Sequence, residues 1–334
     1  MPTSLKSTDD QLHPPGSAVD WRESYYFGFH DDMERAVLTY ISLSPHKGVV
    51  ERIIIMLMPE GGRTLVCIQQ DPLSHFEDGV LEQGVLQLHC LEPLQRWQLQ
   101  AEVDCLSIPH GQEISSVLAA ARTGDVSVEH LPVAFDLSFE ARMPAYRFPA
   151  RSWDFLGEGQ QHFEQIGKIT GWLRIGDKET PFSGLSGRDR SWGVRDWLRH
   201  EWYNWINLQF DEGFAISAAF GRVEGQETSG GFVYRDGLLQ PITEVVIKAQ
   251  RDSDDLHLLA GHVRVVTEEG STFDVQLTPV SFFHAIVARE GKWLNHDCTT
   301  LVISRCEERI GRGLADYAQR ELISPLAPRQ DGIW

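Results

Sequence analysis

The feature of this sequence that most constrains its fold is a long succession of short apolar or alternating segments with almost no helical periodicity between them. Turn signals such as Asp236-Gly237 and Glu269-Gly270 separate these segments, as expected of hairpins. Only Glu113–Arg122 and Leu314–Leu322 show helical periodicity, and both are short. So many strands without intervening helices exclude a doubly wound α/β sheet and favour sandwiches or barrels. The predicted strands are Tyr25–His30, Arg35–Leu43, Val50–Met58, Leu65–Gln69, Arg96–Val103, Val133–Met143, Gln161–Ile175, Trp202–Phe210, Gly213–Arg222, Gly231–Tyr234, Ile242–Ala249, His257–Thr267, Ser271–Leu277 and Cys298–Cys306.

The length of the chain, 334 residues, predicts about two domains. Several glycines and charges cluster between Thr180 and Gly193, which is typical of a boundary. We therefore expect one domain over residues 18–182 and a second over residues 183–334, the latter ending in a short helix over Leu314–Leu322. No internal sequence repeat is visible, but alternation alone can specify two β units of similar size.

Charge and composition limit the classes of partner and the cellular compartment that we expect for this protein. Asp and Glu number 48 against 30 Lys and Arg, a formal charge of -18, which disfavours nucleic acid as a partner. The longest strongly apolar run, Ile53–Met58, is far shorter than the roughly 20 residues that cross a bilayer, so no stable membrane insertion is expected. The first residues contain no apolar secretory core, and the five cysteines form no CxxC pair. These features predict a cytoplasmic protein and leave open whether it forms a homodimer.

The common cofactor and metal motifs are missing. There is no GxSxG, P-loop or HExxH sequence, and Gly157-Glu158-Gly159 is not followed by the third glycine of a dinucleotide fingerprint. His257 and His262 are five residues apart in a predicted strand, so their side chains point to opposite faces and cannot share a metal there. We expect neither a cofactor nor a metal.

One segment, Gly184–Asn207, concentrates unusual residues. It contains two Arg-Asp dipeptides, Arg188-Asp189 and Arg195-Asp196. It also holds four of the ten tryptophans: Trp192, Trp197, Trp202 and Trp205. Because solvated loops do not expose several indoles, these rings must be buried in a core, a domain interface or a ligand site. In one interpretation, Arg–Asp salt bridges hold the two halves of the chain together, and the indoles fill the interface between them. In the other, a carboxyl group lies on the floor of an aromatic cavity, where desolvation raises its pKa and lets it hold a proton.

Within this segment, Gly187–Gly193 (GRDRSWG) resembles the Asp-x-(Asn/Ser/Glu)-Trp-Gly signature of the lipocalin-like hydratase and cyclase superfamily. That group includes carotenoid hydratases, AttH-type proteins and fungal Diels–Alderases. Three further stretches are similar to an uncharacterised bacterial branch of it: Trp21–Phe27, Phe163–Gly171 and Trp202–Gly213.

The resemblance implies two tandem lipocalin-like (calycin-type) β-barrels, with a ligand cavity in or between them and the signature near their junction. In carotenoid hydratases the signature Asp is taken to donate a proton to an alkene, and it maps onto Asp189. Those enzymes carry an aromatic residue and a histidine before this Asp, where this chain has Gly187 and Arg188. The resemblance therefore implies alkene chemistry in general and not carotenoid hydration itself.

Our leading hypothesis is Brønsted-acid catalysis on a hydrophobic, unsaturated, isoprenoid- or terpenoid-like substrate. Asp189, kept protonated by burial, would protonate an alkene, and the resulting cation would lie against the rings of Trp192 and Trp205. Capture by water would give hydration, and capture by a second alkene would give cyclisation. Glu164 is a second candidate acid, because alternation places Phe163 and Gln165 on the opposite face of its strand.

The other candidate residues would bind the substrate. Arg188 and Arg195 could hold a carboxylate or diphosphate head group, with Asp196 orienting Arg195, and Tyr203 could donate a hydrogen bond into the cavity. A surface or interface salt bridge is the alternative for Arg188 and for Asp196. Two other functions remain open: a non-catalytic carrier of a lipid, steroid or isoprenoid, and a pericyclase that acts by shape and proximity.

Overall fold

The structure, a computed structural model, describes residues 5–59, 62–73, 75–77, 79–125, 127–149, 160–194, 199–253, 256–289 and 293–322. In these residues almost all regular structure is antiparallel strand, and none of the described helices has the length and apolarity needed to span a bilayer. The elements are η1 (Ser7–Asp10), β1 (Trp21–Asp31), β2 (Ala36–Ser44), η2 (Pro45–Lys47), β3 (Val49–Met58), β4 (Arg63–Pro72), η3 (Val80–Glu82), β5 (Leu86–Glu92), β6 (Arg96–Pro109), α1 (Ile114–Thr123), β7 (Glu129–Ala141), β8 (Tyr146–Arg147), β9 (Gln161–Ile175), β10 (Lys178–Val194), β11 (His200–Asp211), β12 (Phe214–Val223), β13 (Gln226–Arg235), β14 (Leu238–Arg251), β15 (Leu258–Thr267), β16 (Thr272–Arg289), β17 (Trp293–Cys306) and β18 (Arg309–Leu322).

The first half of the chain forms one large sheet that curls back on itself. The strands pair in the order β10-β1-β2-β3-β4-β6-β7-β9, and β9 also pairs with β10, so the hydrogen bonding returns to its start. Successive side chains point alternately inward and outward along each strand. The inward residues of β1, Tyr25, Phe27 and Phe29, pack with Phe135 and Phe139 of β7 in the core of this barrel.

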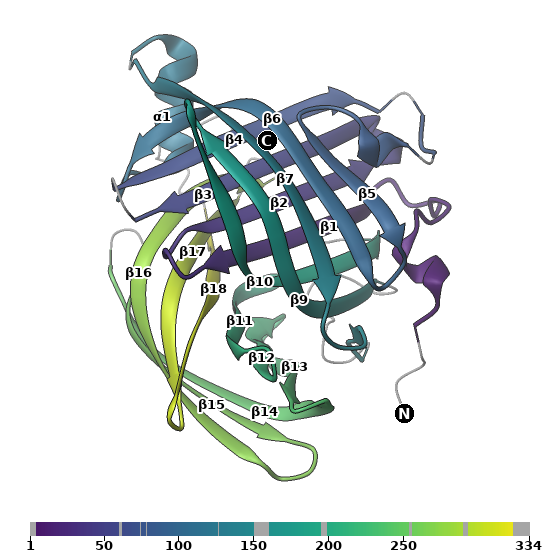
Figure 1. The fold of residues 1–334 in the computed structure, drawn as a ribbon, viewed down its shortest axis with the longest axis vertical. Helices are drawn as coiled ribbons and strands as arrows, with labels where there is room; N and C mark the ends of the chain where they lie inside the picture. Colours follow the sequence, from purple (N-terminus) through teal and green to yellow (C-terminus); the bar gives the residue numbers. More distant parts are fainter. Residues whose placement is uncertain are drawn as a thin grey trace.

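The second half forms a closed barrel of β11 to β18, in which neighbours in sequence are neighbours in the sheet and β18 pairs with β11. Its hairpins use backbone conformations that suit tight turns: Asp236 and Gly237 both have positive φ values, 51° and 87°. Ile206, Leu208 and Ile216 belong to its interior. Figure 1 shows this barrel, in green and yellow, lying against the first one. The prediction of an all-β fold with two tandem barrels is confirmed.

The helix predicted over Glu113–Arg122 is present as α1. The Glu113 side chain caps it by accepting hydrogen bonds from the backbone N–H groups of Ser115 and Ser116, each at 2.7 Å, and Gly124 ends it in a left-handed conformation with φ 79°. The prediction of a helix over Leu314–Leu322 was wrong, because this segment lies within β18. Pairing with both β11 and β17 closes the second barrel, and this tertiary requirement overrides a short helical pattern.

The boundary expected at residues 182/183 falls inside β10. This strand pairs with β1 and β9 along its length, and the chain passes to the second barrel between Val194 and His200. Two of the glycines that suggested a linker, Gly184 and Gly187, serve close packing instead. A Cβ on Gly184 would strike the backbone carbonyl of His30 on β1, so only glycine fits there.

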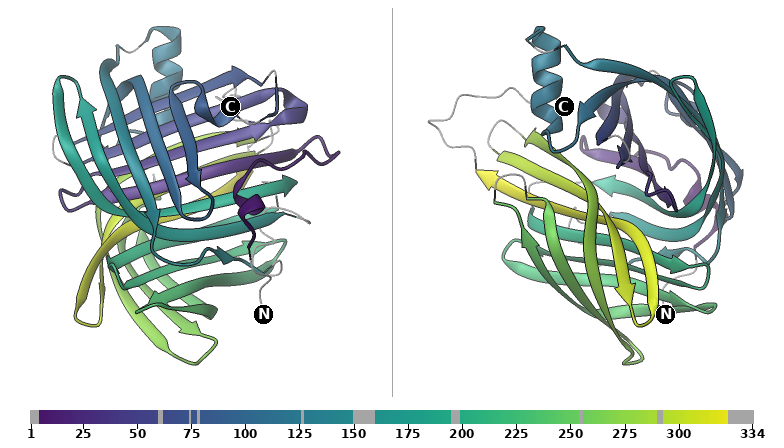
Figure 2. Two further views of the ribbon diagram at one scale, coloured as in Figure 1. Left: turned by 45° about the vertical axis from the view of Figure 1, so that its right-hand side comes forward. Right: turned by 60° about the vertical axis from the view of Figure 1, so that its left-hand side comes forward.

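The two barrels meet through the outward faces of their strands (Figures 1 and 2). Ile55 and Leu57 of β3 pack against Phe283 and Ala285 of β16 in one apolar cluster between the barrels. Helix α1 also crosses the junction, since the Glu113 carboxylate accepts a hydrogen bond from the backbone N–H of Ile286 at 3.0 Å. The orientation of the two barrels is therefore set by packed side chains and not by the connecting segment alone.

Gly187 allows a close approach between the barrels, and an alanine there should weaken their packing. The new Cβ would lie 2.5 Å from the amide nitrogen of Asn207 on β11, so the buried Asn207 side chain, which accepts a hydrogen bond from Gln209, would have to shift. We expect Gly187→Ala to lower the free energy of unfolding by about 1–3 kcal/mol, as overpacking commonly does. Urea denaturation measures the effect. In an Asn207→Ala background the same substitution should cost much less, and equal costs in both backgrounds would refute this account.

Candidate functional site

A cavity of about 300 Å³ lies between the two barrels. Strands β1 to β4, β9 and β10 provide one wall, and β11, β12 and β16 to β18 provide the other. Much of the lining is apolar or aromatic, including Ile53, Ile55, Phe283, Tyr40 and Trp205. A largely apolar, concave site with a few polar groups is the usual form of a small-molecule site in proteins.

The wall formed by the first barrel carries a grid of polar side chains on neighbouring strands. Asp189 of β10 lies directly opposite Tyr26 of β1 and Glu164 of β9, and Ser191 lies opposite His162 one row further along. Residues directly opposite one another in a sheet share a face, so all five side chains point outward toward the second barrel. Of these five, all except Glu164 line the cavity.

Glu164 lies beneath the cavity wall and is fully buried. Its Oε1 accepts hydrogen bonds from Trp205 Nε1 at 3.0 Å and from His162 Nε2 at 3.1 Å, and its Oε2 contacts the Ser217 hydroxyl. Burial raises the pKa of Glu164 to about 8, although the hydrogen bonds from Ser217 and Trp205 oppose this shift. Since Ser217 Oγ also lies 3.3 Å from the carbonyl of Ile206, the serine can donate to that carbonyl while accepting from a protonated Glu164.

His162 joins Glu164 to the cavity surface. Its Nδ1 lies 2.7 Å from Ser191 Oγ, and its Nε2 faces Glu164 as described above. When His162 Nε2 carries the ring proton, it donates a hydrogen bond to Glu164. Nδ1 is then unprotonated and accepts a hydrogen bond from the Ser191 hydroxyl. The three side chains therefore form a continuous hydrogen-bonded path from the buried carboxyl to the cavity.

The wall formed by the second barrel carries a carboxyl of its own. Asp316 of β18 lies in one row between Trp205 of β11 and Thr299 of β17. Burial raises the pKa of Asp316 to about 7; the hydrogen bond from Thr299 lowers it, while the charges of Asp297 and Asp189 raise it further. Its Oδ1 is buried and has no hydrogen-bond partner among the described residues.

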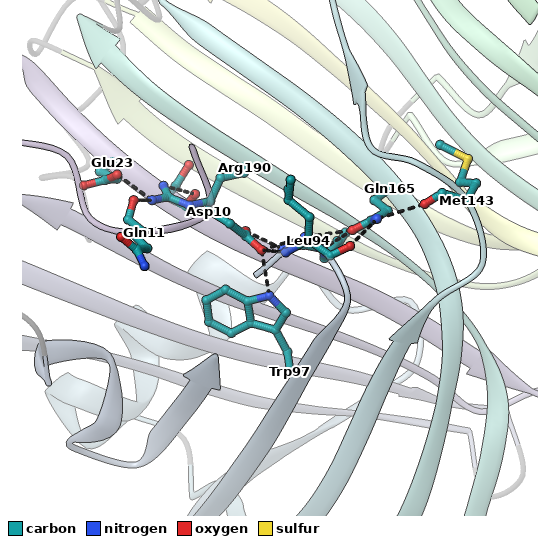
Figure 3. Close-up of polar contacts among 10 residues, drawn as sticks. Asp10, Gln11, Glu23, Leu94, Trp97, Met143, Gln165 and Arg190 are labelled. Carbon is teal, nitrogen blue, oxygen red and sulfur yellow. Dashed lines mark hydrogen bonds and ion pairs between the residues drawn. The ribbon is translucent and has the colours of Figure 1, made fainter. Parts of the chain in front are cut away.

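The arginine beside Asp189 points away from the cavity. Alternation places Arg188 inside the first barrel, where its Nη1 donates to Asp10 Oδ1 at 2.8 Å and its Nε donates to Gln165 Oε1 at 2.9 Å. Asp10 also accepts from Trp97 Nε1 at 3.1 Å, as Figure 3 shows. This ion pair holds the N-terminal segment against the first barrel, and the head-group role expected for Arg188 has no place in this geometry.

The remaining predicted residues separate into three groups. Tyr203 and Trp205 line the cavity together with Asp189. Trp192 lies on the other face of β10, where its ring stacks on His13 with centroids 4.0 Å apart. Arg195 and Asp196 lie outside the described residues.

Sequence reasoning missed several residues of the site. Alternation from Glu164 and Asp189 could have placed His162 and Ser191 on the same face as those acids. Asp316 had no such signal, since its segment was interpreted as a helix. In the part of the chain that the structure describes, no three His, Cys, Asp or Glu side chains come together as a metal site.

Comparisons with known proteins agree with this architecture. The solved structure of an AttH candidate from Nitrosomonas europaea is 13% identical, with a TM-score of 0.62, and the match covers 95% of this chain and 97% of that one. CghA, solved with Sch210972, is 13% identical with a TM-score of 0.57 over 95% and 97% of the two chains. Kievitone hydratase from Nectria haematococca is 12% identical with a TM-score of 0.57 over 95% and 93%.

These identities show a shared fold. No curated protein matches the sequence significantly. A family described as a domain of unknown function, DUF7064, matches residues 6–321, nearly the whole chain. The protein therefore belongs to the DUF7064 family, whose fold in this chain is a pair of β-barrels enclosing an acid-lined cavity.

Proposed function

We propose that this protein catalyses proton transfer to a hydrophobic, unsaturated small molecule in the cavity between its barrels, as a hydratase or a cyclase. One observation carries the proposal: Asp189 lies in the wall of a largely apolar, aromatic cavity, directly opposite a fully buried glutamate. Carboxyl groups in such surroundings hold protons at a pH where solvated carboxyls are ionised. The raised pKa of Glu164 shows this effect in the same grid.

In the proposed mechanism, Asp189 donates its proton to one carbon of an alkene, which forms a C–H bond and leaves a cation on the other carbon. The rings of Trp205 and Tyr203 in the opposite wall can stabilise that cation. In hydration, water adds to the cation and returns a proton to Asp189. In cyclisation, a second alkene adds instead, and loss of a proton to Asp189 completes the reaction.

Glu164 would support this step from behind the wall. Its hydrogen bond to Trp205 Nε1 fixes the indole, and its contact with His162 connects it to Ser191 at the cavity surface. We infer that Glu164 is a positioning residue and a proton reserve, while Asp189 contacts the substrate. The substrate class that we propose is isoprenoid- or terpenoid-like, because the cavity is largely apolar.

The similar structures support a small-molecule function. One is named as a hydratase, and another was solved with the small molecule Sch210972. Together with the Asp-x-Ser-Trp-Gly sequence, this supports placing the chain among lipocalin-like hydratases and cyclases, in the bacterial branch that its sequence resembles.

Deuterium incorporation tests the proposal. The protein is incubated in D₂O with a panel of acyclic polyenes, such as geraniol, farnesol and squalene, and the products are analysed by mass spectrometry. Protonation of an alkene places one deuterium on carbon in either outcome. We expect Asp189→Asn to lower turnover by about 10²- to 10⁴-fold, the usual contribution of a general acid. Asp104→Asn, a substitution of an exposed aspartate on β6, should have no effect.

The other outcomes would contradict the proposal in different ways. Product formation unchanged in Asp189→Asn and without deuterium would indicate a pericyclase. Binding of the polyenes without turnover in either form would indicate a carrier. Circular dichroism of Asp189→Asn shows whether any loss reflects unfolding.

A further inference from the structure

The charged groups that line the cavity are mostly acidic. Among the described residues, the lining includes the carboxyls of Glu51, Asp189, Asp297 and Asp316 but only one guanidinium, that of Arg22. The Arg22 side chain donates hydrogen bonds to the Tyr40 hydroxyl at 2.7 Å and to the Ser42 hydroxyl at 2.5 Å. In the part of this lining that the structure describes, carboxyl groups therefore outnumber guanidinium groups.

Two buried oxygen atoms of the residues that line the cavity have no hydrogen-bond partner among the described residues. One is Oδ1 of Asp316, and the other is the hydroxyl of Tyr26, a residue that is 7% exposed. A buried acceptor without a donor is costly, so native structures rarely keep one unless a ligand or water completes it. A ligand with N–H groups would supply the donor that Asp316 lacks.

The aromatic side chains around Asp316 suit a positive charge. Trp205 lies next to Asp316 in the barrel wall, and its ring packs edge-on against Tyr26 with centroids 5.2 Å apart. Tyr203 and Phe283 lie in the same wall. Aromatic rings around a carboxylate form the kind of cage that binds substituted ammonium ions, through ring faces and the opposite charge together.

These observations select among head groups. A carboxylate or phosphate would place its negative charge beside the Asp316 carboxylate, and a neutral molecule would leave the Asp316 oxygen without a charged donor. We propose that the substrate of this cavity is a hydrophobic amine, whose protonated nitrogen pairs with Asp316. This inference rests on the proposed function only in taking the cavity as the substrate site, and it assigns Asp316 to anchoring and Asp189 to proton donation.

Equilibrium binding of matched probes tests the charge preference without any turnover. Isothermal titration calorimetry compares 2-naphthylmethylamine, 2-naphthylmethanol and 2-naphthoate, which share one rigid apolar body and differ in charge. We expect the amine to bind about 10- to 100-fold more tightly than the alcohol, as one charge-assisted hydrogen bond implies, and the carboxylate to bind most weakly.

Substitutions then locate the anchor. Asp316→Asn should lower the ratio of the amine affinity to the alcohol affinity by about tenfold or more. The affinity for the alcohol itself should stay nearly unchanged. Asp274→Asn is the matched control, since Asp274 is an exposed aspartate of the same barrel that is paired with Arg264 at 2.8 Å. Should Asp316→Asn fail to fold, the comparison of the three probes on the unsubstituted protein still decides the charge preference.

The inference is overturned if the naphthoate or the alcohol binds as tightly as the amine, or if folded Asp316→Asn keeps the full preference. These outcomes are separate from a failure of the proposed function. An acid catalyst with a neutral substrate would show deuterium incorporation but no preference for the amine, whereas an amine carrier would show the preference without turnover.

Discussion

Replacing Asp10 with asparagine is expected to destabilise the first barrel by about 3–5 kcal/mol, the usual cost of leaving a buried charge without its partner. Arg188 is 1% exposed and Asp10 is fully buried. Although burial is the largest influence on Asp10 and opposes its ionisation, the charge and hydrogen bonds of Arg188 hold the pKa of this carboxyl below its usual value. The asparagine keeps the shape of Asp10 but removes the charge that Arg188 needs. Urea denaturation followed by tryptophan fluorescence measures the loss.

The neighbouring aspartate provides a matched control. Asp9 lies in the same turn of η1 and pairs with Arg147 at 2.9 Å, but both side chains are about one-fifth exposed. Asp9→Asn should therefore cost about 1 kcal/mol or less. The double variant Asp10→Leu/Arg188→Met removes both charges and should recover a large part of the loss. If Asp10→Asn costs no more than Asp9→Asn, the ion pair does not stabilise the barrel in the way proposed here.

This ion pair also shows where sequence reasoning reaches its limit. Asp10 and Arg188 are separated by most of the first barrel, and nothing local marks them as partners. Alternation along GRDRSWG does separate Arg188 and Trp192 from Asp189, because adjacent residues of a strand point to opposite faces. Reading this segment as one compact cluster, without the alternation of a strand, assigns residues on two opposite faces to a single site.

The architecture was more accessible than the site. Period-two alternation and turn residues are local signals, and they predicted the strands and the barrel class. Asp316 depends on a pairing that local signals do not encode, since β18 joins β11 across the closed barrel. The cavity itself forms where outward faces of two barrels meet, and a single sequence does not show which outward residues face a neighbour and which face water.

Replacing Glu164 with glutamine should change how stability depends on pH. The pKa of Glu164 is about 8 in the folded protein against an ordinary value of 4.5, so the folded state keeps its proton while the unfolded state loses it. The stabilisation that this difference provides is fully present below pH 4.5 and is lost as the pH rises toward 8. Each pH unit in that range lowers the free energy of unfolding by up to about 1.4 kcal/mol. The pKa of Asp316 is about 7 in the folded protein against an ordinary value of 3.8. Its ionisation therefore also lowers the free energy of unfolding as the pH rises, over a lower pH range than that of Glu164.

Because glutamine does not titrate, Glu164→Gln should remove its share of this slope, and the variant should gain stability relative to the natural protein between pH 5 and pH 8. Urea denaturation at pH 5, 6, 7 and 8 measures the slope in each protein. Glu140→Gln, a substitution of an exposed glutamate on β7, should leave the slope unchanged. An unchanged slope in Glu164→Gln would mean that Glu164 is ionised in the folded protein near neutral pH. In that case Trp205, His162 and Ser217 all donate hydrogen bonds to a carboxylate, and Glu164 cannot serve as the proton reserve of the cavity.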